Sequence, residues 1–226
     1  MIKSYRNYTP FIYRLIIYGI LPFSILSGEI AMMIYRPFLP NTHEEIVDMF
    51  VRFISMCPIA MVYTIVVVDI TVFKGIYSKE NRYESFLLMS ENGKKIIEQT
   101  VLADAICKNL LMLFVGGLTA IISYYGFPPM YKETSFSFAN ILSLVINSIL
   151  LIQFSTWVVR HFMNWAHMLW MMAFLYTALI PMFLGISISS WITYKNVFYQ
   201  SIFALVFSII NVRSIKKNIR KNWAKD

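Results

Sequence analysis

Residues 74–108 read KGIYSKENRYESFLLMSENGKKIIEQTVLADAICK and form the longest polar interval in an otherwise strongly apolar chain. Within this interval Tyr83, Phe86 and Leu87 recur at helical spacing, which predicts a short amphipathic helix. The dipeptide Asn92-Gly93 then favours a turn that ends this helix. The interval is therefore expected to begin with one short helix and a turn.

After the turn, the sequence predicts a second helix that begins near Lys94 and continues into the next apolar run. Ile97, Val101 and Ala105 fall on one face of this helix. A short helix, a turn and a helix that re-enters the bilayer together indicate a segment that contacts something outside the membrane.

The composition of the chain is that of a polytopic membrane protein. Hydrophobic residues make up 58% of the 226 residues, charged residues only 14%, and the mean hydropathy is +0.61. The net charge of +8 would suggest nucleic acid as a partner of a soluble protein. In an apolar chain it indicates membrane topology instead, and no nucleic-acid partner is expected. Cys57 and Cys107 are expected near opposite ends of their spans, which argues against a disulfide between them.

We predict an all-α fold with six transmembrane helices in a single transmembrane domain covering residues 1–226. The predicted spans are about residues 15–35, 50–73, 109–127, 138–159, 167–187 and 197–212. Residues 74–108 link the second span to the third as a coupling segment, and the basic tail, residues 213–226, is predicted to be helical.

The basic residues predict the orientation of these six spans. Sixteen of the 20 Lys and Arg residues fall on the side that contains both termini, the 74–108 segment and Arg160, which is assigned to the connection after the fourth span. The positive-inside rule therefore predicts that this side is cytoplasmic. The chain is expected in the plasma membrane, with both termini in the cytoplasm.

Motifs for catalysis or nucleotide binding are missing. The sequence has no G-x-x-x-x-G-K-[ST] loop. His43-Glu44-Glu45 resembles the start of a zinc-protease H-E-x-x-H motif, but Val47 stands where the second histidine ligand is required. An intramembrane CAAX-type protease would need Arg at position 49, which is Met49. We therefore expect no enzymatic activity, cofactor or metal in this chain.

Two acidic residues lie within predicted spans. Glu29 lies about 9 Å below the outer end of the first span, at 1.5 Å per residue, and Arg52 starts the second span at the same face. The two are either a structural ion pair or a functional intramembrane site. Asp69 lies one turn from the cytoplasmic end of its span, where snorkelling or pairing with Lys74 would satisfy it.

The third and fourth spans carry polar and small residues at helical spacing. Asn140, Ser143 and Asn147 share one face, which predicts either a substrate path or hydrogen bonds between helices. Gly116 and Ala120 form a small-x-x-x-small pair, which favours close helix packing.

The central segment resembles the first cytoplasmic loop of permease subunits of type-2 ABC exporters. The resemblance rests on Tyr83–Ser90, Gly93–Ile97 and Lys108. In that family a Glu begins a short coupling helix, a basic residue and an apolar pair follow, and a Lys lies near the start of the third span. This sequence differs at Met89, where Pro is common, and in the turn at Glu91-Asn92-Gly93.

The resemblance implies a homo- or heterodimer of permease subunits in the lipid bilayer, bound to two separate ATPase subunits that hold ATP and magnesium. It implies export of an amphipathic peptide, toxin, antibiotic or lipid-like substrate. The ATPase-coupling residues would be Tyr83, Glu84, Phe86, Leu87 and Met89.

Two other functions remain open at this stage. A non-transport membrane protein, such as an immunity or sensor subunit, would use residues 74–108 to dock a different partner. An intramembrane protease is disfavoured by its incomplete motif. An associated ATPase would distinguish an exporter from both.

Overall fold

The computed structural model describes residues 2–35, 60–65, 67–69, 92–126, 138–161, 165–179, 182 and 192–222. Its named elements are α1 (Ile2–Tyr8), α2 (Phe11–Leu15), η1 (Ile16–Ile20), α3 (Leu21–Tyr35), α6 (Gly93–Gly126), α8 (Phe138–His161), α9 (Trp165–Phe174), η4 (Leu175–Leu179) and α11 (Tyr194–Asn222). Residues 60–65 and 67–69 are also helical. No strand occurs in the described ranges, so the prediction of an all-α fold is confirmed for this part of the chain.

The first long helix contains one widened turn. α2, η1 and α3 follow one another without a break, and the backbone N–H of Leu21 donates to the carbonyl of Ile16, five residues earlier. The next residue is Pro22, which has no backbone N–H and whose ring would clash with a carbonyl four residues back. The π-turn accommodates this proline while the helix continues.

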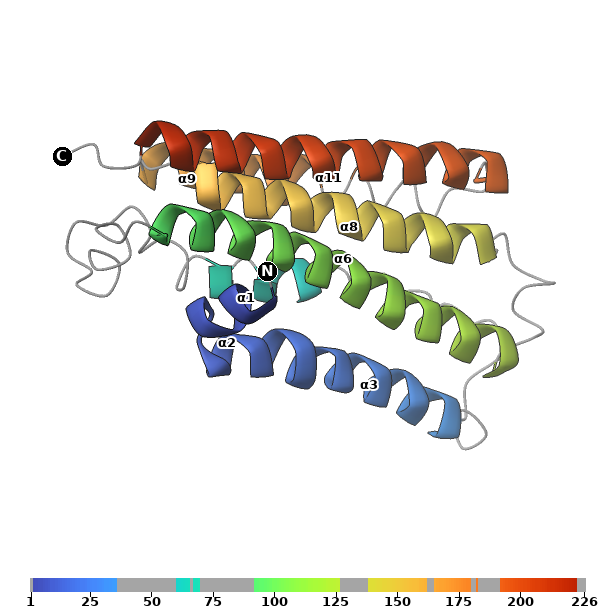
Figure 1. Cartoon of the computed structure of the whole chain (residues 1–226). Helices are drawn as coiled ribbons and strands as arrows, with labels where there is room; N and C mark the ends of the chain where they lie inside the picture. The colour runs from blue at the N-terminus through green and yellow to red at the C-terminus, as the bar shows by residue number, and fades with distance from the viewer. Residues whose placement is uncertain are drawn as a thin grey trace.

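Four long helices lie alongside one another, with α3 and α6 running in one direction and α8 and α11 in the opposite one (Figure 1). α6 and α11 run in opposite directions to each other, as do α6 and α8. Each of α6, α8 and α11 contacts the other two, and α3 packs against α6. α6 begins and α11 ends at the same end of the bundle, as the six-span layout predicts for these two helices.

α8 is the central helix of the bundle. In its most apolar window 83% of the residues are buried, against 22% in the first and last long helices. The buried residues include Asn140, Ser143, Gln153 and Arg160, so the polar groups of α8 face other helices. Hydrogen bonds between helices replace their lost hydration.

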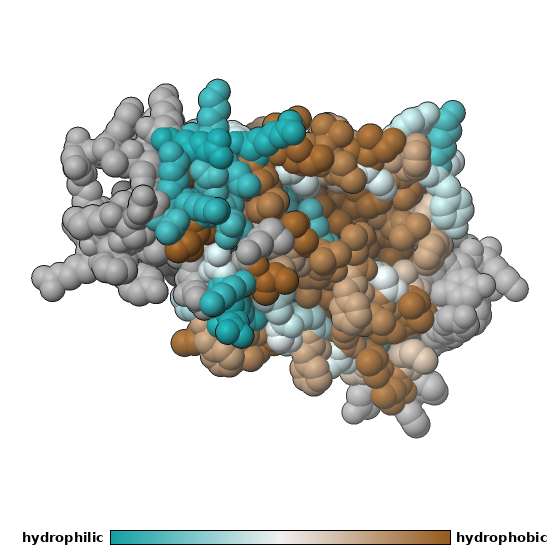
Figure 2. All heavy atoms as spheres, in the orientation of Figure 1, coloured by the Kyte–Doolittle hydropathy of each residue, from teal (hydrophilic) through white to brown (hydrophobic). Residues whose placement is uncertain are grey.

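Within the described part of the chain, four helices are long and apolar enough to cross a membrane: Phe11–Ile34, Gly93–Ile122, Phe138–His161 and Tyr194–Arg220. Figure 2 shows apolar side chains over most of one face, with hydrophilic side chains gathered at the end where α6 begins and α11 ends. An apolar belt with a polar end is typical of a membrane-spanning protein. The chain is therefore a membrane-spanning helical protein.

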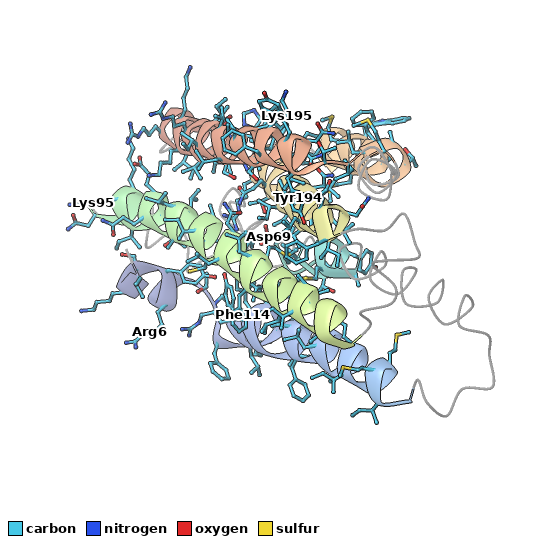
Figure 3. All side chains as sticks on the ribbon, turned by 90° about the vertical axis from the view of Figure 1, so that its right-hand side faces the viewer. Arg6, Asp69, Lys95, Phe114, Tyr194 and Lys195 are labelled. Carbon is cyan, nitrogen blue, oxygen red and sulfur yellow. The ribbon has the colours of Figure 1, made fainter. Side chains whose placement is uncertain are left out.

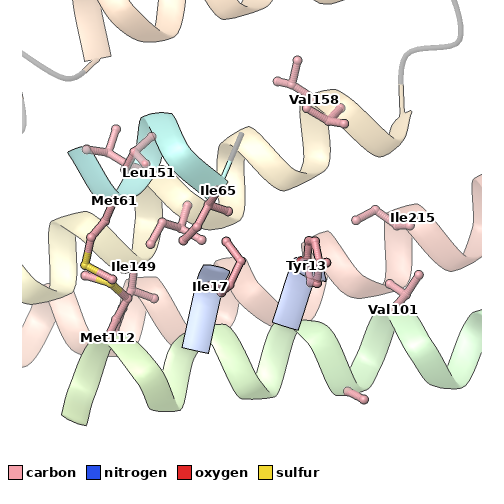
Figure 4. Close-up of a cluster of buried hydrophobic side chains, with 14 of the residues drawn as sticks. Tyr13, Ile17, Met61, Ile65, Val101, Met112, Ile149, Leu151, Val158 and Ile215 are labelled. Atoms are coloured by element: carbon pink, nitrogen blue, oxygen red, sulfur yellow. The ribbon is translucent and has the colours of Figure 1, made fainter. Parts of the chain in front are cut away.

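The apolar core lies between α6, α8 and the first helix (Figure 4). Ile17 of η1, Met112 of α6 and Leu151 of α8 all belong to it and are at most 4% exposed. Ile97 and Val101 of α6 are also in this core. The predicted apolar face of the helix after the Asn-Gly turn is thus confirmed.

The small-residue pair also lies at a helix contact. A Cβ atom added to Gly116 would overlap the side chain of Val145 on α8, whereas one added to Gly117 would meet nothing within 4 Å. Ala120 is buried one turn later. The predicted close approach between α6 and a neighbouring helix is confirmed, and the neighbour is α8.

The basic tail after the predicted sixth span is helical, as predicted, as far as residue 222. α11 continues through the basic tail to Asn222, because Ile215 and Ile219 keep one face of the tail buried against the core. Most of the predicted second span and the latter part of the fifth lie outside the described residues, as does the coupling helix at 83–90.

Candidate functional site

Two acidic and two basic side chains meet inside the bundle, near its polar end. Asp104 and Lys108 lie one turn apart on α6, Arg160 comes from the last turn of α8, and Asp69 ends the helical segment 67–69. All four residues are at most 1% exposed. Figure 3 shows Asp69 in the interior between the helices, whereas Lys95 and Arg6 point outward at the periphery. We call these four residues the buried ionic network.

Each cation of the network contacts both carboxylates. Lys108 Nζ lies 2.8 Å from Asp69 Oδ1 and 2.9 Å from Asp104 Oδ2. Arg160 Nη2 lies 2.6 Å from Asp104 Oδ2 and 3.4 Å from Asp69 Oδ1. Two positive and two negative charges cancel, which is the condition under which charges are tolerated in a low-dielectric interior.

Tyrosine hydroxyls from the N-terminal helices complete the network. Tyr13 Oη lies 3.1 Å from Asp69 Oδ1 and 2.9 Å from Asp104 Oδ1. A phenol has one proton to donate, so Tyr13 donates to one carboxylate at a time and can switch between them. Tyr13 is 1% exposed, which keeps this hydroxyl away from competing water.

α1 adds a second hydroxyl pair. Tyr5 Oη lies 3.2 Å from Asp104 Oδ1 and 2.7 Å from Tyr18 Oη. Burial, together with the nearby carboxylate of Asp104, raises the pKa of Tyr5 well above its ordinary value. Tyr5 therefore stays protonated and donates to Asp104, while Tyr18 donates to Tyr5.

The network fixes the relative positions of helices that are far apart in sequence. Asp104 of α6 and Arg160 of α8 are 56 residues apart, and Tyr13 of α2 is 91 residues from Asp104. Removing one partner would leave a charged side chain unpaired in the interior. In comparable buried ion pairs, this lowers the free energy of unfolding by about 3–5 kcal/mol. Chemically, this arrangement can lock helices together, and it can transmit a displacement of α6 to α8.

Two sequence-based assignments are corrected by this geometry. Asp69 does not rely on snorkelling to the membrane surface, because it is fully buried with Lys108 and Arg160 as its ion-pair partners. Arg160 belongs to the last turn of α8 rather than to a connection between helices. Its side chain points inward because Asp104 and Asp69 offer the charge partners that the apolar surroundings lack.

The network was missed as a site, although the sequence contains signals for it. Asp104 and Lys108 have the spacing of an i, i+4 pair. Asp69 and Arg160 each lie near the predicted cytoplasmic end of an apolar run. These four residues form a group when charged residues of opposite sign are compared by their depth in the predicted spans.

Glu29 is held inside the bundle by a residue of α6. Thr119 Oγ1 donates to Glu29 Oε1 at 2.7 Å, and Glu29 is fully buried. Within the described part of the chain, Glu29 Oε2 accepts no hydrogen bond, and it adjoins a cavity of 30 Å³. The predicted partner of Glu29, Arg52, lies outside the described residues.

The polar stripe on α8 is buried in the bundle. Asn140, Ser143 and Asn147 are at most 3% exposed, and Asn147 Nδ2 donates to Ser143 Oγ at 3.4 Å. This hydrogen bond lies within α8, so both predicted roles, a substrate path and hydrogen bonds between helices, stay predictions.

A second polar cluster joins α6, α8 and α11 midway along the bundle. Gln153 Nε2 donates to Asn109 Oδ1 at 2.6 Å, and Asn211 Nδ2 donates to the carbonyl of Gln153 at 2.6 Å. Asn109 Nδ2 also donates to Ser208 Oγ at 3.3 Å. These amides fix α11 against the other two helices.

The residues predicted to couple to an ATPase, Tyr83, Glu84, Phe86, Leu87 and Met89, lie outside the described residues. The structure does describe the helix that follows them. α6 begins at Gly93, the second residue of the predicted Asn92-Gly93 turn, and is 34 residues long.

Comparison with known proteins brings no match: no protein-family model, curated protein or solved structure is significantly similar to this chain.

Proposed function

We propose that this chain is the membrane-spanning permease subunit of an ATP-driven type-2 ABC exporter, acting as a dimer with two separate ATPase subunits. The sequence resemblance of residues 83–97 supports this assignment, and the apolar helices agree with it. The observation that carries the proposal furthest is α6, which begins at Gly93, shortly after the predicted coupling helix at residues 83–90, and carries Asp104 and Lys108 into the bundle.

In this proposal the ATPase subunits move α6 through the coupling helix at residues 83–90. A continuous helix transmits a displacement along its axis. The ion pairs of Asp104 and Lys108 with Arg160 and Asp69 then carry that displacement to α8 and the second span. The membrane halves would alternate between inward and outward states as the ATPase dimer closes and opens.

The distribution of charge supports the orientation in this proposal, whereas the partners and the substrate are implied by the family resemblance. The polar end of the bundle faces the cytoplasm of a plasma-membrane protein, with both termini there. ATP and magnesium bind in the partner subunits. The mostly apolar helix surfaces suit an amphipathic substrate, such as a peptide, toxin, antibiotic or lipid-like molecule, which is exported from the cell.

Affinity purification with its associated proteins tests this function. Phe86→Ala with Leu87→Asp removes the apolar anchors that an ATPase groove would bury. We expect this double variant to insert normally and to lose both the ATPase subunit and substrate-stimulated hydrolysis. Ser78→Ala with Lys79→Ala, in the same segment but before the short helix, should retain both.

Two results would overturn the proposal. In the first, the Phe86/Leu87 variant still co-purifies with a fully active ATPase. In the second, these residues capture a partner that has no ATPase activity, which would favour the immunity or sensor alternative.

A further inference from the structure

A groove of 560 Å³ runs between α6 and α11, on the face of the molecule shown in Figure 2. Ile106 and Leu113 of α6 and Leu205 and Ile209 of α11 line it, and each is between 40% and 63% exposed. Ile149 of α8 also lines the groove and is buried. The volume is within the range of sites that bind small molecules.

The groove has a basic end. Arg213 and Lys216 of α11 line it there, and neither forms a salt bridge with any described residue. One turn further along α11, Arg220 binds Glu98 of α6 through two hydrogen bonds of 2.7 Å. The Glu98 carboxylate also interacts electrostatically with Lys216, so Arg213 is the more fully available of the two cations.

The length of the groove matches one leaflet of a bilayer. On α6 its lining extends from Leu102 to Leu113, about 16 Å at 1.5 Å per residue. The hydrocarbon core of a bilayer is about 30 Å thick, so one leaflet is about 15 Å deep. An acyl chain with its headgroup at the basic end would therefore fit along the groove.

The polar residues within the groove do not conflict with an apolar occupant. Asn109 and Ser208 both line it, but they hydrogen-bond to each other at 3.3 Å, and Asn109 also accepts from Gln153. Their polar groups are thus already partnered, and their presence costs a bound acyl chain little.

We propose that this groove is a binding site for one anionic phospholipid of the leaflet at the polar end of the bundle. One acyl chain lies between α6 and α11, and the phosphate lies between Arg213 and Lys216. The apolar lining contributes burial, and the two cations select a negatively charged headgroup over a zwitterionic one. This site requires no ATPase partner, so it stands or falls independently of the exporter function.

Native mass spectrometry of the purified full chain tests the site, using phosphatidylglycerol and phosphatidylcholine with identical acyl chains. Arg213→Gln with Lys216→Gln is expected to weaken phosphatidylglycerol binding at least tenfold and to leave phosphatidylcholine binding unchanged. Lys195→Gln with Lys217→Gln removes the same charge from α11 outside the groove and should change binding less than twofold. The charge-conserving exchange Arg213→Lys with Lys216→Arg should retain binding and shows that the site tolerates substitution.

Three results would overturn the proposal. Equal losses in both Gln pairs would indicate a general effect of net charge. Equal affinity for the two lipids would exclude a headgroup site. Formation of disulfide-linked dimers by Leu205→Cys in membranes, without selective lipid binding, would assign the groove to a second copy of the chain.

Discussion

Arg160 of α8 and Asp104 of α6 form the shortest ion pair within the described residues, with 2.6 Å between Nη2 and Oδ2. Both side chains are at most 1% exposed. Asp104 also contacts Lys108, and Asp69 contacts both cations. The two helices are therefore joined by a neutral cluster in which no charge can be removed alone without leaving another unbalanced.

Removing single charges from this cluster should destabilise the fold strongly. We expect Asp104→Asn and Arg160→Gln each to lower the free energy of unfolding by about 3–5 kcal/mol, because each leaves a buried charge without its partner. The double variant keeps the neutral pair of Asp69 and Lys108, so its loss should be smaller than the sum of the two single losses. Unfolding in detergent, analysed as a double-mutant cycle, measures this coupling.

The control for this cycle is the exposed salt bridge between Glu98 and Arg220. Glu98→Gln should change the free energy of unfolding only slightly, because solvent screens the attraction between exposed charges. Strictly additive losses at Asp104 and Arg160 would show that the two side chains do not interact.

The hydroxyl of Tyr13 should contribute to stability in its own right. Tyr13→Phe removes the hydroxyl donor that Asp69 and Asp104 share. It should lower the free energy of unfolding by about 1.5–3 kcal/mol, as expected for a hydrogen bond to a charged group. Tyr199→Phe, on the exposed face of α11, should be neutral. Thermal unfolding of both variants in one detergent compares them, and equal midpoints would contradict the role given to Tyr13.

Neighbouring glycines on α6 should respond in opposite ways to the same substitution. Gly116→Ala places a methyl group against Val145, and overpacking of this kind costs about 1–3 kcal/mol. Gly117→Ala meets open space and should be neutral or stabilising by up to about 1 kcal/mol. The extra change Val145→Ala should recover much of the Gly116→Ala loss. A greater loss at Gly117 than at Gly116 would mean that α6 does not pack on α8 through this face.

Thr119 should contribute to the stability of the fold through its hydrogen bond to Glu29. Thr119→Val removes the donor at 2.7 Å from Glu29 Oε1 and should cost about 1–3 kcal/mol, since a buried carboxyl loses its hydrogen bond. Adding Glu29→Leu should restore most of this stability. Thr177→Val is the matched control, because Thr177 is exposed and donates to the carbonyl of Ala173, four residues earlier. If Glu29→Leu worsens the Thr119→Val defect, a different partner holds Glu29.

Much of the fold could be predicted because apolar length and local turn chemistry are encoded in short stretches. The Asn92-Gly93 turn and the buried face at Ile97 and Val101 follow directly from the sequence. The helical form of the basic tail is predicted as well. The burial of Ile215 and Ile219 in the core is a result of tertiary packing, which the sequence of the tail alone does not contain.

The candidate site was less accessible to sequence analysis. Lys108 and Arg160 were counted as cytoplasmic charges, because a positive-inside count weighs each residue separately. Their actual partners, Asp104 and Asp69, become evident only when depth in one helix is compared with depth in another. Pairing across helices is a three-dimensional property, whereas the polar stripe and the Gly116 contact are visible within one helix.

We propose that residues 74–92 and the polar end of the bundle face the cytoplasm, where ATPase subunits could engage them. The most direct measurement is labelling of single cysteines in intact cells with a membrane-impermeant thiol reagent. Ser78→Cys, Thr134→Cys and Ser190→Cys are each introduced after Cys57 and Cys107 are replaced by Ser. We predict labelling at positions 134 and 190 and protection at position 78, which should become labelled once the cells are opened. Labelling at position 78 in intact cells, or protection at both other positions, would contradict the orientation and with it the proposed coupling.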